Sequence, residues 1–135
     1  AAEMSAKLIA DGVWDAVAER RDMLQMLLED GADGIISVGK DVPRLPNTLS
    51  VITPDWKGET QVMQMDLAGF AVSAGSACSS GKVKSSRVLR AMGYSDAYAS
   101  CAMRVSLGPE TTTDEIERFA NAWISAYARW KQRAA

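Results

Sequence analysis

The chain has 135 residues, of which 47% are hydrophobic and 24% charged, with a formal net charge of −2 and no His. This length suits a single domain over residues 1–135. The slightly negative net charge does not indicate a nucleic-acid-binding protein. No apolar run approaches the roughly 20 residues that span a bilayer, and no signal-peptide pattern is present, so we expect no membrane segment and a cytoplasmic protein. The lack of His excludes Ser-His-Asp and Cys-His catalysis within the chain and argues against an ordinary zinc site.

The first part of the chain predicts a long amphipathic helix followed by two strands. Apolar residues recur at helical spacing over residues 2–30, and Asp30-Gly31 ends the pattern. Residues 34–38 and 48–53 are rich in β-branched side chains, which favours strands, and the proline-containing segment between them predicts a loop. The sequence starts inside a helical pattern without an initiating methionine, so we expect an excised segment of a longer protein.

The middle of the chain predicts shorter elements. Helical propensity over residues 59–68 is followed by a short apolar strand at 70–73. After a loop of small residues, two short helices are expected: "SRVLRAM", which Gly93 closes, and "DAYASC", which Ser95 caps.

The last strand and helix complete the predicted fold. Residues 103–107 alternate between apolar and polar, which predicts that Arg104 leaves the core side of a half-buried strand. The final helix begins with a capping box from Thr112 to Glu115 and continues with apolar residues at spacings of three and four. The order of elements predicts an α+β two-layer sandwich, in which long N- and C-terminal helices cover a small sheet.

Three tryptophans of the predicted long helices add a packing expectation. Trp14, Trp123 and Trp130 lie on the amphipathic faces. We expect them to pack the two long helices together or to pack against a domain outside this chain.

The two cysteines predict different roles. Cys101, at a helix end, is predicted to be buried and structural. Cys78 lies in a loop that cannot bury much apolar area and would lose much conformational entropy if it were held in one conformation. Lys82 and Lys84 nearby, with a helix beginning a few residues on, favour the nucleophilic thiolate. A swinging thiol suits a carrier that takes up a group at one site and presents it at another. The alternative is a small buried hydrophobic residue in a turn, and both thiols are expected to be free. The other residues of the loop are Gly75, Ser76, Ala77, Ser79, Ser80 and Gly81.

Several motifs in order resemble one enzyme family. "SAGSACSSG" followed by "RVLRAMG" and then "MRVSLGPETTTDEIERF" resembles the C-terminal part of the NifS-type cysteine desulfurases, within the class V aminotransferase group. The upstream "PRLPNTLSV" fits the same family, so the resemblance runs from about residue 8 to residue 127. It implies the small domain of a fold-type I pyridoxal phosphate enzyme, which takes sulfur from L-cysteine and leaves alanine.

The resemblance also implies roles for two residues. Cys78 would attack the substrate sulfur, become a persulfide and pass the sulfur to an acceptor such as an iron-sulfur scaffold protein. Arg104 would bind the α-carboxylate of the substrate, which a guanidinium fork matches bidentately. The intact enzyme is expected to be a homodimer.

Two departures from the family pattern qualify these roles. Lys84, Ser85, Ser86 and Arg87 stand where many relatives have Glu-Pro-Ser-His, which predicts a more basic and less rigid exit from the loop. The lysine, histidine and aspartate with which the family holds pyridoxal phosphate have no counterpart here, so this segment alone is expected to be inactive. Alternative functions are a selenocysteine lyase domain, a class V aminotransferase domain, or a stand-alone persulfide carrier module.

Overall fold

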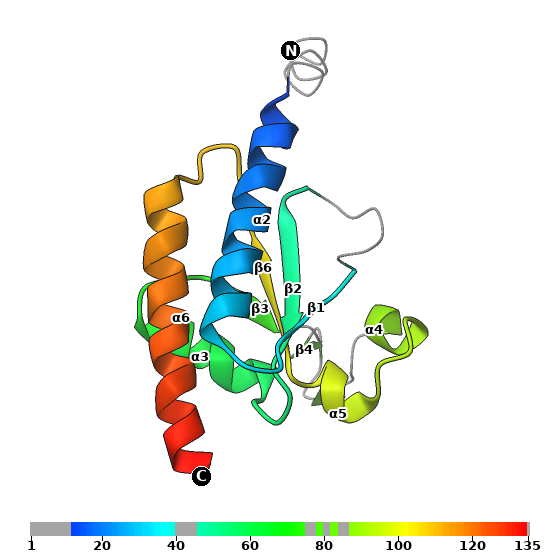
Figure 1. Cartoon of the computed structure of the whole chain (residues 1–135). Helices are drawn as coiled ribbons and strands as arrows, with labels where there is room; N and C mark the ends of the chain where they lie inside the picture. The colour runs from blue at the N-terminus through cyan, green and yellow to red at the C-terminus, as the bar shows by residue number, and fades with distance from the viewer. Residues whose placement is uncertain (1–11, 40–45, 75–77, 80–81, 84–86, 135) are drawn as a thin grey trace.

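The fold is an antiparallel sheet with its two long helices on one face (Figure 1), as seen in a computed structural model that describes residues 12–39, 46–74, 78–79, 82–83 and 87–134. The main sheet has four strands in the order β1-β2-β6-β3, and β4 pairs with β5 separately. The predicted α+β class is confirmed. The elements are α2 (Val13–Gly31), β1 (Ile36–Ser37), β2 (Thr48–Ile52), α3 (Gly58–Leu67), β3 (Ser73–Ala74), β4 (Cys78–Ser79), β5 (Lys82–Val83), α4 (Arg87–Ala91), α5 (Asp96–Ala99), β6 (Ala102–Ser106) and α6 (Thr113–Ala134).

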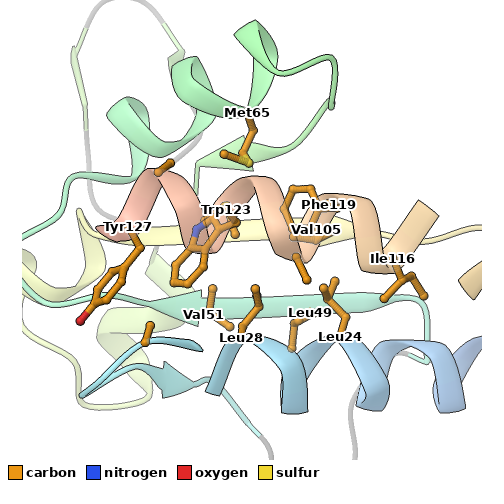
Figure 2. Packing of buried hydrophobic residues seen from close by; sticks show 14 of the residues in the cluster. Leu24, Leu28, Leu49, Val51, Met65, Val105, Ile116, Phe119, Trp123 and Tyr127 are labelled. Carbon is orange, nitrogen blue, oxygen red and sulfur yellow. The ribbon is translucent and has the colours of Figure 1, made fainter. Parts of the chain in front are cut away.

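The core lies between the sheet and the two long helices, as Figure 2 shows. Leu49 and Val51 of β2 point from the sheet toward Leu24 and Leu28 of α2, because alternate residues of a strand face the same side. Full burial of each such side chain stabilises the fold by about 1.5–3 kcal/mol. The buried residues of α6 are Ile116, Phe119, Ala120, Trp123, Ala126 and Tyr127.

The start of α6 has the predicted capping box. The N–H of Glu115 donates to Thr112 Oγ1 at 3.1 Å, and the N–H of Thr112 donates to Glu115 Oε1 at 3.1 Å. These two bonds satisfy backbone donors that the first turn of a helix leaves without partners.

Further along the helix, Ile124 lies so close to Gly31 that a Cβ at residue 31 would collide with its side chain. The two long helices therefore pack tightly where α2 ends.

An aromatic cluster joins α6 to the turn between β2 and α3. The ring of Trp56 in this turn lies 5.5 Å from that of Trp123 and stacks on Trp130, also at 5.5 Å. Trp14 packs against the same core while partly exposed. These tryptophans thus pack within the described part of the chain, and the principal aromatic partner of Trp123 and Trp130 is Trp56, which the sequence analysis did not single out.

Two predicted elements begin later than expected. Gly12 has a left-handed backbone, with φ of 90°, so no helix runs continuously over residues 2–30; α2 begins at Val13, and residues 1–11 lie outside the described part. The predicted strand at 70–73 begins at Ser73, because only Ser73 and Ala74 pair with β6. The other predicted helices and strands are present, with boundaries shifted by one or two residues.

A smaller cluster covers one end of the opposite face of the sheet. Ile52 of β2 and Ala102 of β6 are register partners on this face, and they pack with Leu89 of α4, Ala99 of α5 and Cys101. The short helices α4 and α5 therefore lie over this end of the sheet (Figure 1).

Candidate functional site

Arg104 lies on β6, an inner strand of the sheet, and faces away from the long helices. Its neighbours Met103 and Val105 are buried in the core against the helices, whereas Arg104 is exposed. This is the alternation that the sequence predicted. Because β6 has hydrogen-bonded strands on both sides, the backbone of Arg104 is fixed from both directions.

The pairing register places a serine on each side of Arg104. Ser50 of β2 is its partner on one side and Ser73 of β3 its partner on the other. One row further along the strands, Thr48 pairs with Ser106 on the same face. These five residues define a polar strip, which we call the Arg104 face. Arg104, Ser73 and Ser106 are exposed in it, and Ser50 and Thr48 are half-buried.

The guanidinium of Arg104 has no partner among the residues that the structure describes. Arg21, Arg90 and Arg118 form ion pairs at 3.0, 3.1 and 3.0 Å with acidic residues, but no such bond to Arg104 is found within the described ranges. An arginine presents five N–H donors in a planar fork that matches a carboxylate with two parallel hydrogen bonds. The Arg104 face can therefore receive a carboxylate or a similar anion.

Cys78 begins the short strand β4, four residues after the end of β3, the strand that lies beside Arg104. Cys78 pairs with Val83, and Ser79 with Lys82, so this stretch forms two short strands where the sequence predicted an irregular loop. Cys78 follows Ser73 by five residues, and this length of chain reaches at most about 18 Å. The register of β3 thus keeps the backbone of Cys78 within that reach of the row containing Arg104. Of the other predicted loop residues, Gly75, Ser76, Ala77, Ser80 and Gly81 lie outside the described residues, and only the backbone of Ser79 is described.

Hydrogen bonds from two other elements hold the turn that leads into β6. Gly58 N–H, at the start of α3, donates to Ser100 O at 2.9 Å, and Thr53 N–H donates to Cys101 O at 3.3 Å. The fully buried Gln61 donates from Nε2 to the same Cys101 oxygen at 3.3 Å. This junction fixes the start of the strand on which Arg104 lies.

Gln61 is a residue that sequence reasoning missed, because a glutamine in an amphipathic helix reads as part of the solvent face. Its Oε1 accepts a hydrogen bond from Trp123 Nε1 at 3.1 Å, and its Nε2 also donates to Trp56 O at 2.9 Å. The sequence signal that could have indicated a buried polar partner was Trp123, because a buried indole N–H needs a hydrogen-bond acceptor.

Cys101 is buried, with 2% of its surface exposed, and it is a free cysteine. The predicted burial of this residue is confirmed. Its thiol packs with Ile52, Ala99 and Ala102 beneath α4 and α5. It is therefore inaccessible to a substrate in this structure.

The described residues do not fit a pyridoxal phosphate site. Such a site needs a lysine that forms a Schiff base in a pocket, with a partner for the pyridine nitrogen. Lys57 is exposed and donates to Ser100 Oγ at 3.1 Å, and Lys131 is exposed on α6, 5.9 Å from the ring centre of Tyr127. A groove of about 260 Å³, bordered by Phe70 and Phe119, has neither lysine in its lining.

No helix in the described ranges is both long and apolar enough to cross a lipid bilayer. This finding concerns only the residues that the structure describes.

Comparisons with known proteins assign the family. The model of the family "Aminotransferase class-V" matches residues 1–119. A cysteine desulfurase from Cereibacter sphaeroides is 39% identical over 114 residues, which are 84% of this chain and 30% of that protein. "Cysteine desulfurase IscS" from Pseudomonas aeruginosa is 34% identical over 103 residues, covering 76% of this chain and 25% of the relative.

A solved structure gives the same result for the fold. The NifS-like protein from Rickettsia africae superimposes with a TM-score of 0.74 and 26% identity, over 85% of this chain and 29% of that one. The chain therefore spans less than a third of the length of these proteins. From the family match and these similarities together, the chain belongs to the class V aminotransferase family and is similar to its NifS-type cysteine desulfurases.

Proposed function

We propose that this chain is the C-terminal small domain of a pyridoxal phosphate-dependent cysteine desulfurase, whose cofactor is bound by a larger domain outside the chain. The relatives named cysteine desulfurase are about three to four times as long as the matched segment, which leaves room for such a domain. The observation that carries the proposal is the exposed Arg104, free of partners among the described residues, in register with the strand that leads to Cys78.

In this proposal Arg104 binds the α-carboxylate of L-cysteine. Two charge-assisted hydrogen bonds orient the substrate on the Arg104 face, and each hydrogen bond to a charged group contributes about 1.5–3 kcal/mol. The position of Arg104 in the middle of a paired sheet supports this role, because a fixed backbone limits the positions that the guanidinium can take.

Cys78 is the proposed sulfur acceptor. Its thiolate attacks the sulfur of the bound cysteine, a sulfur–sulfur bond forms, and the carbon–sulfur bond of the substrate breaks. The electron pair of that bond stays on carbon, which takes up a proton, so alanine leaves and Cys78 retains a persulfide. A second thiolate, on an acceptor, then takes the outer sulfur and releases the Cys78 thiolate.

The acceptor and the assembly follow from the resemblance. The similarity to a protein named IscS supports an iron-sulfur scaffold as the sulfur acceptor, and the family resemblance supports a homodimer. The cytoplasmic location predicted from the sequence remains a prediction.

Of the three alternative functions, two keep part of this chemistry. A selenocysteine lyase would use the same carboxylate site with selenium in place of sulfur, whereas an aminotransferase would have no use for Cys78. A stand-alone carrier would receive sulfur on Cys78 from another protein, without pyridoxal phosphate.

The test uses the full-length protein that contains this chain, purified with pyridoxal phosphate. With L-cysteine we expect alanine and, in the presence of a reducing thiol, sulfide; omission of the cofactor should abolish both. Cys78→Ala should stop the release of sulfide, whereas Cys101→Ala, at the buried cysteine, should retain it. Full activity of Cys78→Ala would contradict the proposal, and charging of Cys78 by another protein without cofactor would support the carrier.

A further inference from the structure

The neighbours of Arg104 raise a question about how its guanidinium stays available. On an exposed sheet face, arginine commonly pairs with an acidic residue on the adjacent strand, because opposite charges directly across a strand pair attract. Elsewhere in this chain Arg90 and Arg118, which lie on helices, form ion pairs with acidic residues of helices. The two positions directly across from Arg104 are instead Ser50 and Ser73.

The remaining same-face positions around Arg104 are also uncharged. Thr48 and Ser106 form the next row in one direction, and Ile52 and Ala102 form the next row in the other. Within the described strands, no carboxylate therefore stands in any row next to Arg104 on this face. The hydroxyl groups of serine can accept a hydrogen bond from a guanidinium without neutralising its charge.

We propose that Ser50 and Ser73 are positioning residues of the carboxylate site, which keep the Arg104 guanidinium free of an internal counter-ion and so set its affinity for the substrate. This inference rests on the proposed function, in which Arg104 binds the substrate carboxylate. An acidic residue at position 50 or 73 has its Cβ about 4.5–5.5 Å from that of Arg104 and competes with the substrate for the same N–H donors.

The test compares aspartate with asparagine, which has nearly the same size and no charge, at positions 50 and 73. The variants are made in the full-length enzyme with its cofactor. Ser50→Asp and Ser73→Asp should each raise the KM for L-cysteine roughly three- to tenfold with little change in kcat, because binding is lost equally in the ground and transition states. Ser50→Asn and Ser73→Asn introduce side chains of nearly the same size as aspartate but without the charge, so each should raise KM clearly less than the aspartate variant at the same position. Unchanged melting temperatures would show that folding is not the cause.

The dependence on Arg104 is measured with a double-mutant cycle. Once Arg104→Ala has removed the guanidinium, Ser73→Asp should cause no further increase in KM. Aspartate variants with unchanged KM, or asparagine variants as impaired as the aspartate ones, would overturn the inference. An additive effect of Ser73→Asp in the Arg104→Ala background would also overturn it.

The failure of this inference can be told apart from failure of the proposed function. If Arg104→Ala raises KM strongly while the aspartate variants do not, only the role of the serines is wrong. If Arg104→Ala itself leaves KM unchanged, Arg104 is not the carboxylate ligand. The role proposed for Arg104 and the role proposed for the two serines are then both wrong.

Discussion

Replacement of Gln61 by leucine tests the junction that connects α3, α6 and the turn before β6. In the structure, the buried side chain of Gln61 accepts from Trp123 Nε1 at 3.1 Å and donates to Trp56 O at 2.9 Å and to Cys101 O at 3.3 Å. Leucine has a similar size and no polar atoms. The substitution therefore leaves the indole N–H and the Trp56 carbonyl without this partner, while Cys101 O keeps the N–H of Thr53.

The expected loss follows from these two groups. A buried polar group that loses its hydrogen-bond partner costs about 1–3 kcal/mol, and the added apolar surface of leucine returns about 1 kcal/mol. With two such groups, we expect Gln61→Leu to lower the free energy of unfolding by about 1–5 kcal/mol.

Urea titration of the 135-residue chain, followed by tryptophan fluorescence and circular dichroism, measures this loss. The matched control is Gln64→Leu, one turn along α3, where the half-buried side chain makes no hydrogen bond to the described residues. A value for Gln61→Leu within about 0.5 kcal/mol of the unchanged chain, which is typical of neutral surface substitutions, would refute the reasoning.

Three further substitutions test other contacts by the same titration. Gly58→Ala places a Cβ against a backbone carbonyl of β6, so we expect a loss of about 2 kcal/mol or more, whereas Gly108→Ala, with open space around it, should change stability little; equal effects would contradict this account. Thr112→Ala removes the capping box and should cost about 1 kcal/mol, and an unchanged midpoint would count against the cap. Tyr127→Phe removes the hydroxyl that bonds the backbone of Asp33 at 3.2 and 3.4 Å, with an expected loss of about 0.5–1.5 kcal/mol; a stabilised variant would show that these bonds do not contribute.

Elements with a local signal could be predicted from the sequence. The capping box at Thr112 and the helix that follows it depend on residues close together in the chain, and both are present as predicted. The exposure of Arg104 also follows from local alternation, because a strand buried on one face must turn every second residue outward.

The surroundings of Arg104 could not be predicted in this way. Ser50, Ser73 and Arg104 come from three strands that are distant in the chain, and a local pattern does not fix which residues become register partners. Burial of Gln61 likewise depends on Trp123, which is 62 residues away. The strand pair at Cys78 was missed because glycine and serine favour turns, and only the pairing of residues 78 and 79 with residues 83 and 82 shows the strands.

The most direct test of the central claim locates the transferred sulfur atom. The full-length protein with pyridoxal phosphate is exposed briefly to L-cysteine, its persulfides are trapped by alkylation, and its peptides are analysed by mass spectrometry. We predict one additional sulfur atom on the peptide containing Cys78 and none on the peptide containing Cys101. Alanine formation without additional sulfur on Cys78, or with the sulfur found only at Cys101, would contradict the account.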